Sequence, residues 1–161
     1  MEGVLELRAA SAADARAIAE IHVAGWRAAY RGLMPDAQLD ALSVEQRASF
    51  WTRTLSLPAP SRVIVAGDAG FCSYGPTRDA GEQDDVAEIY ALYVMPDCWR
   101  RGIGRALCGR AVTDAASRSC SAMALWVLVQ NGLARRFYEA LGFAADGTQR
   151  NNEIRYRKLL D

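Results

Sequence analysis

The segment from Glu88 to Leu107 constrains this chain more than any other part of its sequence. It reads as an apolar strand that stops at Pro96, a short basic loop, and a helix that begins at Gly102. A helix that starts just after a glycine-rich loop directs several unpaired backbone N–H groups, and the positive end of its dipole, at one point. Glycine at this start and again at Gly104 leaves room for a diphosphate to lie on the backbone. The segment therefore predicts an anion-binding site.

Two widespread nucleotide-binding patterns do not fit this site. A dinucleotide-binding fingerprint requires a third glycine where Leu107 stands, and a Walker A loop requires Lys and then Ser or Thr where Arg105 and Ala106 follow Gly104. The glycine pair by itself leaves two interpretations open, a phosphate cradle and a tight turn that lets a helix pack closely. Positive charge at the rim of the predicted site comes from Arg100, Arg101 and Arg105.

The composition narrows the range of functions. A length of 161 residues suits one domain, which we expect to span residues 1–161. The 19 basic and 19 acidic side chains cancel, which argues against a broad cationic face for nucleic acid. The chain has no C-x-x-C spacing and a single histidine, His22, so we expect no metal site and free thiols in a reducing cytoplasm. The four cysteines are Cys72, Cys98, Cys108 and Cys120.

Neither a signal peptide nor a membrane span is expected. Charges at Glu2, Glu6 and Arg8 interrupt the apolar stretch that a signal peptide needs. The longest uncharged stretch, residues 119–134, contains Ser, Gln and Asn and is shorter than the roughly 20 apolar residues of a spanning helix. We therefore expect a cytoplasmic protein with no membrane partner.

The order of predicted elements is helices first and then a strand-rich remainder. Strands are expected at Val4–Arg8, Arg62–Ala66, Phe71–Gly75, Val86–Val94, Ala122–Val129, Phe143–Thr148 and Glu153–Leu159. Helices are expected from Ser11 to Tyr30, from Asp36 to Leu42, after a cap at Ser43, after Gly102, and from Asn131 to Leu141. The two closing strands also offer an edge through which two copies of the chain can pair, so a homodimer is one expectation.

A second motif follows the glycine loop at a characteristic distance. The strand ending LYVMP and the loop WRRGIGRAL are followed by another strand, Asn131, Ala134 and the run FYEALGF from Phe137 to Phe143. Together these resemble the GNAT superfamily of acetyl-CoA-dependent N-acetyltransferases, most strongly between Glu88 and Phe143. One departure is Trp99, which stands where the family usually has Gln or Arg. The resemblance implies an α/β (α+β) fold whose mixed, mostly antiparallel sheet is flanked by helices and opened between two central strands.

The resemblance also assigns roles to residues that bind acetyl-CoA. The family's loop holds the pyrophosphate mainly through backbone N–H groups, and its asparagine at the position of Asn131 orients the arm of the cosubstrate. The arm is expected to lie along the strand before the loop through backbone hydrogen bonds. The binding residues implied are Leu92, Tyr93, Val94, Arg100, Arg101, Gly102, Ile103, Gly104, Arg105 and Asn131.

Acetyl transfer to an amine needs a base for the amine and an acid for the departing thiolate. Glu88 is the candidate base, because it is the one ionisable side chain in an apolar central strand and the family often places a glutamate there. A structural carboxylate paired with an arginine is the alternative for Glu88. Tyr138 is the candidate acid, since the family commonly uses the tyrosine at this position to protonate the thiolate. The alternative for Tyr138 is a ring that only packs.

The acceptor amine is less well defined by the sequence. Trp26 and Tyr30 lie in the helical region that often walls the acceptor pocket in the family, although aromatic residues there also serve to join helices to the sheet. A small polyamine, an antibiotic, an amino acid and a protein N-terminus all remain open as acceptors. Two further alternatives are a non-catalytic module that senses acyl-CoA, and transfer of another acyl group or transfer to a hydroxyl.

Overall fold

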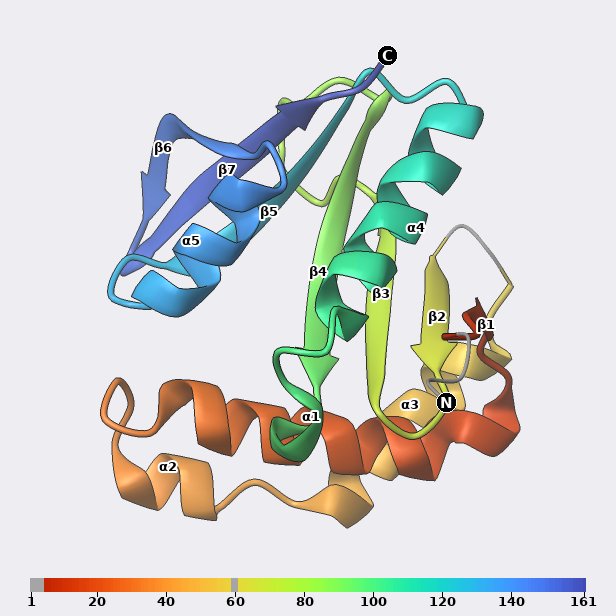
Figure 1. Cartoon of the computed structure of the whole chain (residues 1–161), viewed down its shortest axis with the longest axis vertical. Helices are drawn as coiled ribbons and strands as arrows, with labels where there is room; N and C mark the ends of the chain where they lie inside the picture. The colour runs from red at the N-terminus through yellow and green to blue at the C-terminus, as the bar shows by residue number, and fades with distance from the viewer. Residues whose placement is uncertain (1–4, 59–60) are drawn as a thin grey trace.

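One seven-stranded sheet organises the chain. The computed structural model describes residues 5–58 and 61–161, and its strands follow the order β1-β2-β3-β4-β5-β7-β6 across the sheet (Figure 1). The strands are β1 (Arg8–Ala9), β2 (Arg62–Ala66), β3 (Gly70–Pro76), β4 (Val86–Val94), β5 (Ala122–Leu128), β6 (Ala144–Arg150) and β7 (Glu153–Leu159). The helices are α1 (Ala15–Tyr30), α2 (Asp36–Asp40), α3 (Val44–Ser56), α4 (Ile103–Ser117) and α5 (Gly132–Ala140).

The sheet is mixed, with a single parallel contact among the described strands. β4 and β5 lie side by side in parallel, whereas every other neighbouring pair in the sheet is antiparallel. A parallel pair needs a long crossover connection, which here is the loop after β4 followed by α4. The prediction of a mixed, mostly antiparallel sheet flanked by helices is confirmed.

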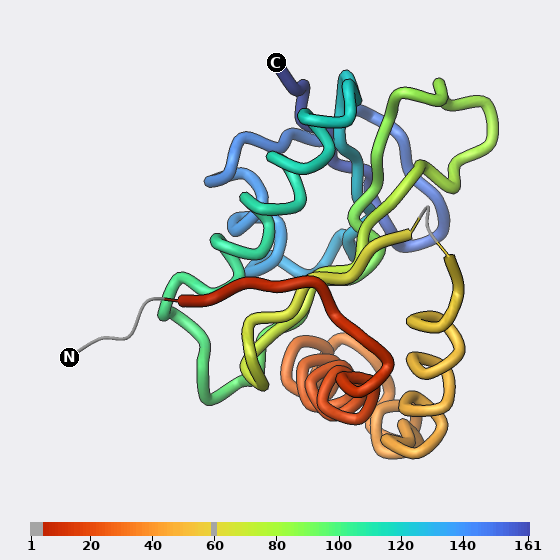
Figure 2. Tube along the Cα trace, turned by 90° about the vertical axis from the view of Figure 1, so that its right-hand side faces the viewer, coloured from red at the N-terminus to blue at the C-terminus, as the bar shows by residue number. Residues whose placement is uncertain are grey.

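Helices cover both faces of the sheet. One apolar core lies between the sheet and α4 with α5, and it includes the fully buried Leu107 and Met123. A second core lies on the opposite face between the sheet and α1 with α3, and it includes Ile18 and Trp51. Figure 2 shows α1 seen end-on against one face, with α4 on the other. The result is a three-layer arrangement with the sheet in the middle.

Two of the predicted helix starts show the expected capping. The Ser43 hydroxyl accepts a hydrogen bond from the Gln46 N–H at the start of α3. The Asn131 side-chain oxygen does the same for the Ala134 N–H at the start of α5, at 3.2 Å. Each cap satisfies a backbone N–H that has no carbonyl partner within its helix, so the local sequence determines where these helices begin.

The prediction of a first strand at Val4–Arg8 is wrong in its extent. Pairing involves Arg8 with Val65 and Ala9 with Ile64, while residues 5–7 are not in a strand and Val4 lies outside the described residues. The reason lies in the partner strand, because β2 ends at Ala66 and the chain turns at Gly67, so residues before Leu7 have no strand to pair with. After Ala9 the chain turns at Ser11, where the Ser11 N–H donates to the Asp14 carboxylate at 2.8 Å. Within the described part of the chain, none of the helices is long and apolar enough to cross a bilayer.

Candidate active site

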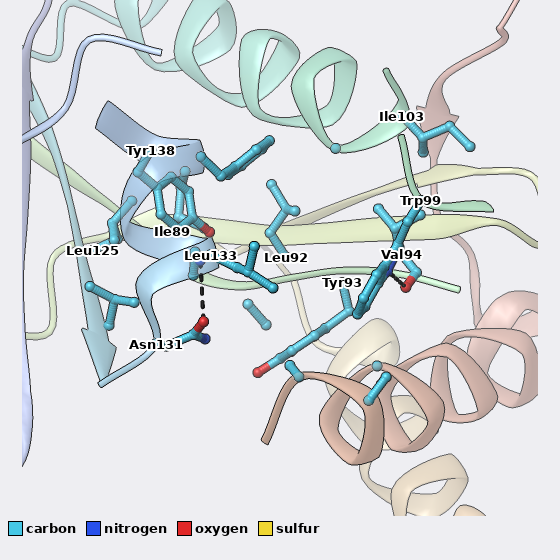
Figure 3. Close-up of a pocket in the computed structure, with 18 of the residues that line it drawn as sticks. Ile89, Leu92, Tyr93, Val94, Trp99, Ile103, Leu125, Asn131, Leu133 and Tyr138 are labelled. Atoms are coloured by element: carbon cyan, nitrogen blue, oxygen red, sulfur yellow. Dashed lines mark hydrogen bonds between the residues drawn. The ribbon is translucent and has the colours of Figure 1, made fainter. Parts of the chain in front are cut away.

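β4 and β5 separate partway along their length. Their backbones pair from Val86 to Ile89, opposite Ala122 to Leu125, whereas β4 continues to Val94. A cavity of about 630 Å³ lies in the opening and extends to the first turn of α4 and the end of α1 (Figure 3). The predicted opening between two central strands is therefore present.

A bulge at Tyr90 reverses the side-chain alternation of β4. Ile89 pairs with Tyr74 and Ala91 with Ser73, which leaves Tyr90 without a partner in the β3 register. Before the bulge, Ile89 faces the core beneath α4, whereas after it Ala91 packs into the core beneath α1. A strand that is apolar on both faces gives no alternation by which the sequence can reveal such a bulge.

The start of α4 presents free backbone N–H groups to the cavity. The first hydrogen bond of the helix runs from the Ala106 N–H to the Gly102 carbonyl at 3.0 Å. Among the described residues, no acceptor bonds the N–H groups of Ile103, Gly104 or Arg105, all of which line the cavity. Such a helix start is suited to an anion.

The two glycines of the loop do different work. Gly102 has a φ of 80°, and a Cβ built there would meet nothing within 4 Å, so the space beside it is open. A Cβ at Gly104 would lie 3.3 Å from the Phe137 ring, so this glycine allows α4 and α5 to pack closely. Gly102 thus fits the interpretation as part of a phosphate cradle, and Gly104 fits the interpretation as a site of close helix packing. Of the three loop arginines, Arg100 and Arg105 line the cavity and Arg101 does not.

The segment Leu92–Val94 forms one wall of the opening. All three residues line the cavity, on the part of β4 that has no pairing to β5. The Val94 carbonyl accepts a hydrogen bond from the Trp99 indole N–H at 2.8 Å (Figure 3). This hydrogen bond fixes the turn between β4 and α4. Trp99 stands where the family usually has Gln or Arg, and those side chains would have to make the contact with other atoms.

Asn131 and Tyr138 form the opposite wall. Both line the cavity and both belong to the α5 segment, with Asn131 capping the helix and Tyr138 lying along it. The Tyr138 hydroxyl points into the cavity (Figure 3), and it makes no hydrogen bond to another described residue. Burial raises the pKa of this hydroxyl well above its ordinary value, so it stays protonated at neutral pH.

Glu88 lies apart from the residues that line the cavity. Its side chain is 1% exposed, and both carboxylate oxygens are bonded by Arg78. The Arg78 backbone N–H donates to Oε1 at 2.9 Å, and the guanidinium Nη2 donates to Oε2 at 2.6 Å. Because of the bulge, Glu88 and Ala91 lie on the same face of the sheet. Glu88 therefore sits at the closed end of the opening, one residue before the last pair of the β4–β5 ladder.

Of the two predicted acceptor-side residues, Tyr30 lines the cavity and Trp26 does not. The Trp26 ring packs edge-on against Tyr30, with 5.0 Å between ring centroids. The Tyr30 and Tyr93 hydroxyls are 3.4 Å apart, and His22, which does not line the cavity, stacks against Tyr93 with 5.2 Å between ring centroids. Trp26 and His22 therefore support the aromatic wall from behind.

Among the residues that line the cavity and were not predicted from the sequence are Tyr90, Trp126 and Glu153. Trp126 is held in place from two sides. Its indole N–H donates to Asp79 at 3.0 Å, and the Arg150 guanidinium lies over its ring at 4.0 Å. No short motif carries these contacts, because Asp79, Trp126 and Arg150 come from segments far apart in the chain.

The residues present fit acetyl-CoA on three independent counts. The free N–H groups at the start of α4 suit a diphosphate, and Arg100 and Arg105 add positive charge. The unpaired stretch of β4 suits an amide-containing arm that binds as an added strand. A protonated hydroxyl, that of Tyr138, faces the same opening from the other side.

Comparisons with known proteins agree with this geometry. The model of the acetyltransferase (GNAT) family matches residues 16–143. The chain is 33% identical over 133 residues to the uncharacterised N-acetyltransferase YuaI of Bacillus subtilis, a match that covers 80% of this chain and 74% of that protein. It is 28% identical over 163 residues to the L-amino acid N-acyltransferase MnaT of Escherichia coli, covering 98% of this chain and 90% of that protein.

Solved structures of N-acetyltransferases have a similar fold. PaiA N-acetyltransferase from Thermoplasma acidophilum, solved in complex with coenzyme A, superposes with a TM-score of 0.77 over 96% of this chain and 98% of that one. Its sequence identity of 22% makes this a likeness of fold. Because the family model spans most of the chain, including the glycine loop and the α5 segment, the chain belongs to the acetyltransferase (GNAT) family and is an acetyl-CoA-dependent N-acetyltransferase.

Proposed function

We propose that the chain, acting as one domain, moves an acetyl group from acetyl-CoA directly to the primary amine of an acceptor bound in the opening of the sheet. The C–S bond of the thioester breaks as the C–N bond forms. The ammonium nitrogen loses two protons in all, one before it attacks and one from the adduct, while the thiolate takes one, so one proton is released to solvent. The observation that carries the proposal is the Tyr138 hydroxyl, which points into the cavity between Asn131 and the free part of β4. Acetyl-CoA supplies the activated carbonyl, and the residues of this chain supply the rest.

Tyr138 acts as the general acid. Burial keeps its hydroxyl protonated, so a donor is present at every pH at which the enzyme would work. The thiol that forms has a pKa of about 8.5, below that of the buried phenol. Tyr138 therefore acts mainly by a hydrogen bond that strengthens as negative charge develops on the sulfur in the transition state.

Glu88 acts as the general base through solvent in the opening. Direct contact with the amine is disfavoured, because Glu88 does not line the cavity and Arg78 occupies both of its oxygens. Its place on the same sheet face as Ala91 and at the closed end of the opening puts it one residue beyond the cavity wall at Ile89. The base matters most for an acceptor whose amine is almost entirely protonated at neutral pH.

The acceptor is a small primary amine with an apolar or cationic body. Tyr30, Trp126 and Tyr93 give the acceptor side of the cavity an aromatic lining. The curated relative MnaT is named for L-amino acids, which supports keeping amino acids among the amines to be tested.

Pairing of two copies of the chain would use β6, which is an edge strand with exposed side chains. Sedimentation of the purified protein tests this pairing.

The test is release of free thiol from acetyl-CoA in the presence of a panel of amines. Amine-dependent release with stoichiometric N-acetylated product supports the proposal. Tight binding of CoA without release on any amine supports a sensor instead, and release with an alcohol or with a longer acyl-CoA as the better substrate supports the remaining alternatives.

A further inference from the structure

We propose that the acceptor carries a second positive charge and that Glu153 is the residue that recognises it. The inference deepens the proposed function and rests on it, because it names the chemical class of the amine that enters the same opening. Glu153 is then a specificity-determining residue that is not part of the glycine loop or of the run from Phe137 to Phe143.

Glu153 lines the cavity beside the C-terminal end of β5. It is the first residue of β7 and pairs with Leu128, the last residue of β5, so it stands beyond the point at which β4 and β5 stop pairing. Among the described residues that line the cavity, the charged ones are Glu153, Arg100 and Arg105. The two arginines belong to the loop and first turn of α4, so positive and negative charge enter the cavity from different elements.

The walls near Glu153 are those that suit a cation. Tyr30 at the end of α1 lines the same cavity, and aromatic faces attract ammonium groups. Trp126 on β5 also lines it and already holds a cation, because the Arg150 guanidinium lies over its ring at 4.0 Å. Burial raises the pKa of Tyr30, and the negative charge of Glu153 raises it further, so the carboxylate lies within electrostatic reach of that hydroxyl. A carboxylate flanked by aromatic rings favours an ammonium or guanidinium group over a neutral or anionic one.

The present partner of Glu153 leaves it free to bind an acceptor. Arg150 Nε lies 3.2 Å from Glu153 Oε1, and the two side chains are 48% and 32% exposed. Exposed pairs of this kind contribute little to stability. Arg150 also has two other contacts, the Trp126 ring at 4.0 Å and Asp79 at 3.9 Å. An incoming ammonium group can therefore share or replace the contact of Arg150 with Glu153 while Arg150 keeps its place on the ring.

The experiment compares three acceptors of similar length that differ in the charge of the distal group: putrescine, n-butylamine and γ-aminobutyrate. We expect kcat/KM for putrescine to exceed that for n-butylamine by about tenfold, as for one partly desolvated charged contact. In Glu153→Gln this ratio should fall towards one, and in Glu153→Lys the preference should move to γ-aminobutyrate. Glu45→Gln removes an exposed carboxylate on α3, far from the cavity lining, and should keep the wild-type ratio.

Equilibrium binding gives a readout that does not need turnover. Putrescine titrated into protein saturated with CoA should bind about tenfold more weakly to Glu153→Gln than to wild type, and an unchanged affinity overturns the inference. A wild-type preference for γ-aminobutyrate, or a putrescine to butylamine ratio that Glu153→Gln leaves intact, overturns it as well. Absence of thiol release with every amine, with CoA and putrescine binding preserved, overturns the proposed function but leaves the recognition of the cation by Glu153 supported.

Discussion

Arg78 binds the carboxylate of Glu88 with its backbone and its side chain together. The backbone N–H contacts Oε1 at 2.9 Å, the guanidinium contacts Oε2 at 2.6 Å, and the guanidinium carbon lies 4.3 Å from the centre of the Tyr90 ring. Through Arg78, Glu88 is thus joined to the loop after β3 and to Tyr90, which lines the cavity. A carboxylate in this position can serve the reaction, hold the loop in place, or do both, and two separate measurements distinguish these roles.

The first measurement is the pH dependence of the rate for an acceptor with a high amine pKa. Glu88→Gln should lower kcat/KM by at least about tenfold and flatten its rise with pH, because a base contributes roughly 10²–10⁴-fold to a proton transfer. The matched control is an amine of low pKa, for which the loss should be smaller. An unaltered profile with the high-pKa amine would confine Glu88 to a structural role.

The second measurement is the stability of the pair. Arg78→Ala should reduce the free energy of unfolding by about 1–2 kcal/mol, because it removes the positive charge beside the buried Glu88 carboxylate and leaves only the backbone N–H contact, and Arg78 is too exposed for the full cost of breaking a buried pair. In the Glu88→Gln background the same Arg78→Ala change should cost less, since no charge is stranded. Urea unfolding of the four proteins in this cycle gives the coupling directly. Equal costs in both backgrounds would show that the two side chains are not coupled.

Gly102→Ala should weaken binding of CoA several-fold and destabilise the fold by about 1 kcal/mol. The residue has a φ of 80°, which an alanine adopts only with strain, and the added methyl group would enter the open space beside the helix start. Gly109→Ala is the matched control, because a Cβ there meets nothing and the position is helical, so it should stabilise the protein by about 0.5–1 kcal/mol. Calorimetric titration with CoA and thermal unfolding measure both effects. Wild-type CoA affinity in Gly102→Ala would place the anion elsewhere.

His22 should make the protein less stable at acidic pH. Burial, assisted by the positive charge of Arg47, lowers the pKa of His22 to about 4, while its Nδ1 accepts a hydrogen bond from the Trp51 indole at 3.3 Å. The unfolded chain, with a histidine pKa of about 6.5, binds the proton more tightly than the folded one. The stability associated with the neutral ring is therefore complete above about pH 6.5 and is lost as the pH falls to about 4, by about 3 kcal/mol in total.

The control for this prediction is His22→Gln, which keeps an acceptor for Trp51 but does not titrate. Other acidic groups affect both proteins alike, so the informative quantity is the difference between their free energies of unfolding at pH 7 and pH 4. His22→Gln should lose less stability over this interval than wild type. Parallel pH profiles would show that His22 does not resist protonation in the folded state.

The sequence predicted those parts of the fold that depend on local signals. The strand Val86–Val94 has the bounds expected from its apolar run, and the cap at Asn131 makes the hydrogen bond that its position suggests. The cap bonds a backbone N–H three residues away, and the bounds of the strand follow its own apolar run, so both signals are local. The prediction of the first strand was wrong in its extent because the length of this strand depends on its pairing with residues near Val65. No local pattern of the first residues encodes that pairing.

The sequence predicted the walls of the site more fully on one side than on the other. The glycine loop and the α5 run form a motif, so the cosubstrate side could be expected from their spacing. On the acceptor side the sequence predicted Tyr30 but not Trp126 or Glu153, because the fold brings these three residues to one cavity from three separate elements. Likewise, the pairing of Arg78 with Glu88 follows from how the loop after β3 folds back over β4. Such contacts require the register of the sheet, which a single sequence does not specify.

The most direct test of the proposed chemistry is Tyr138→Phe, assayed for both turnover and binding of CoA. The substitution removes one hydroxyl that makes no hydrogen bond to another described residue and leaves the buried ring, so the fold should be kept. We predict a fall in kcat of about 10²-fold or more with an affinity for CoA within about twofold of wild type, since a proton donor acts in the transition state and not in binding. An unchanged kcat, or an equal loss in turnover and in CoA affinity, would contradict the role of Tyr138 as the acid.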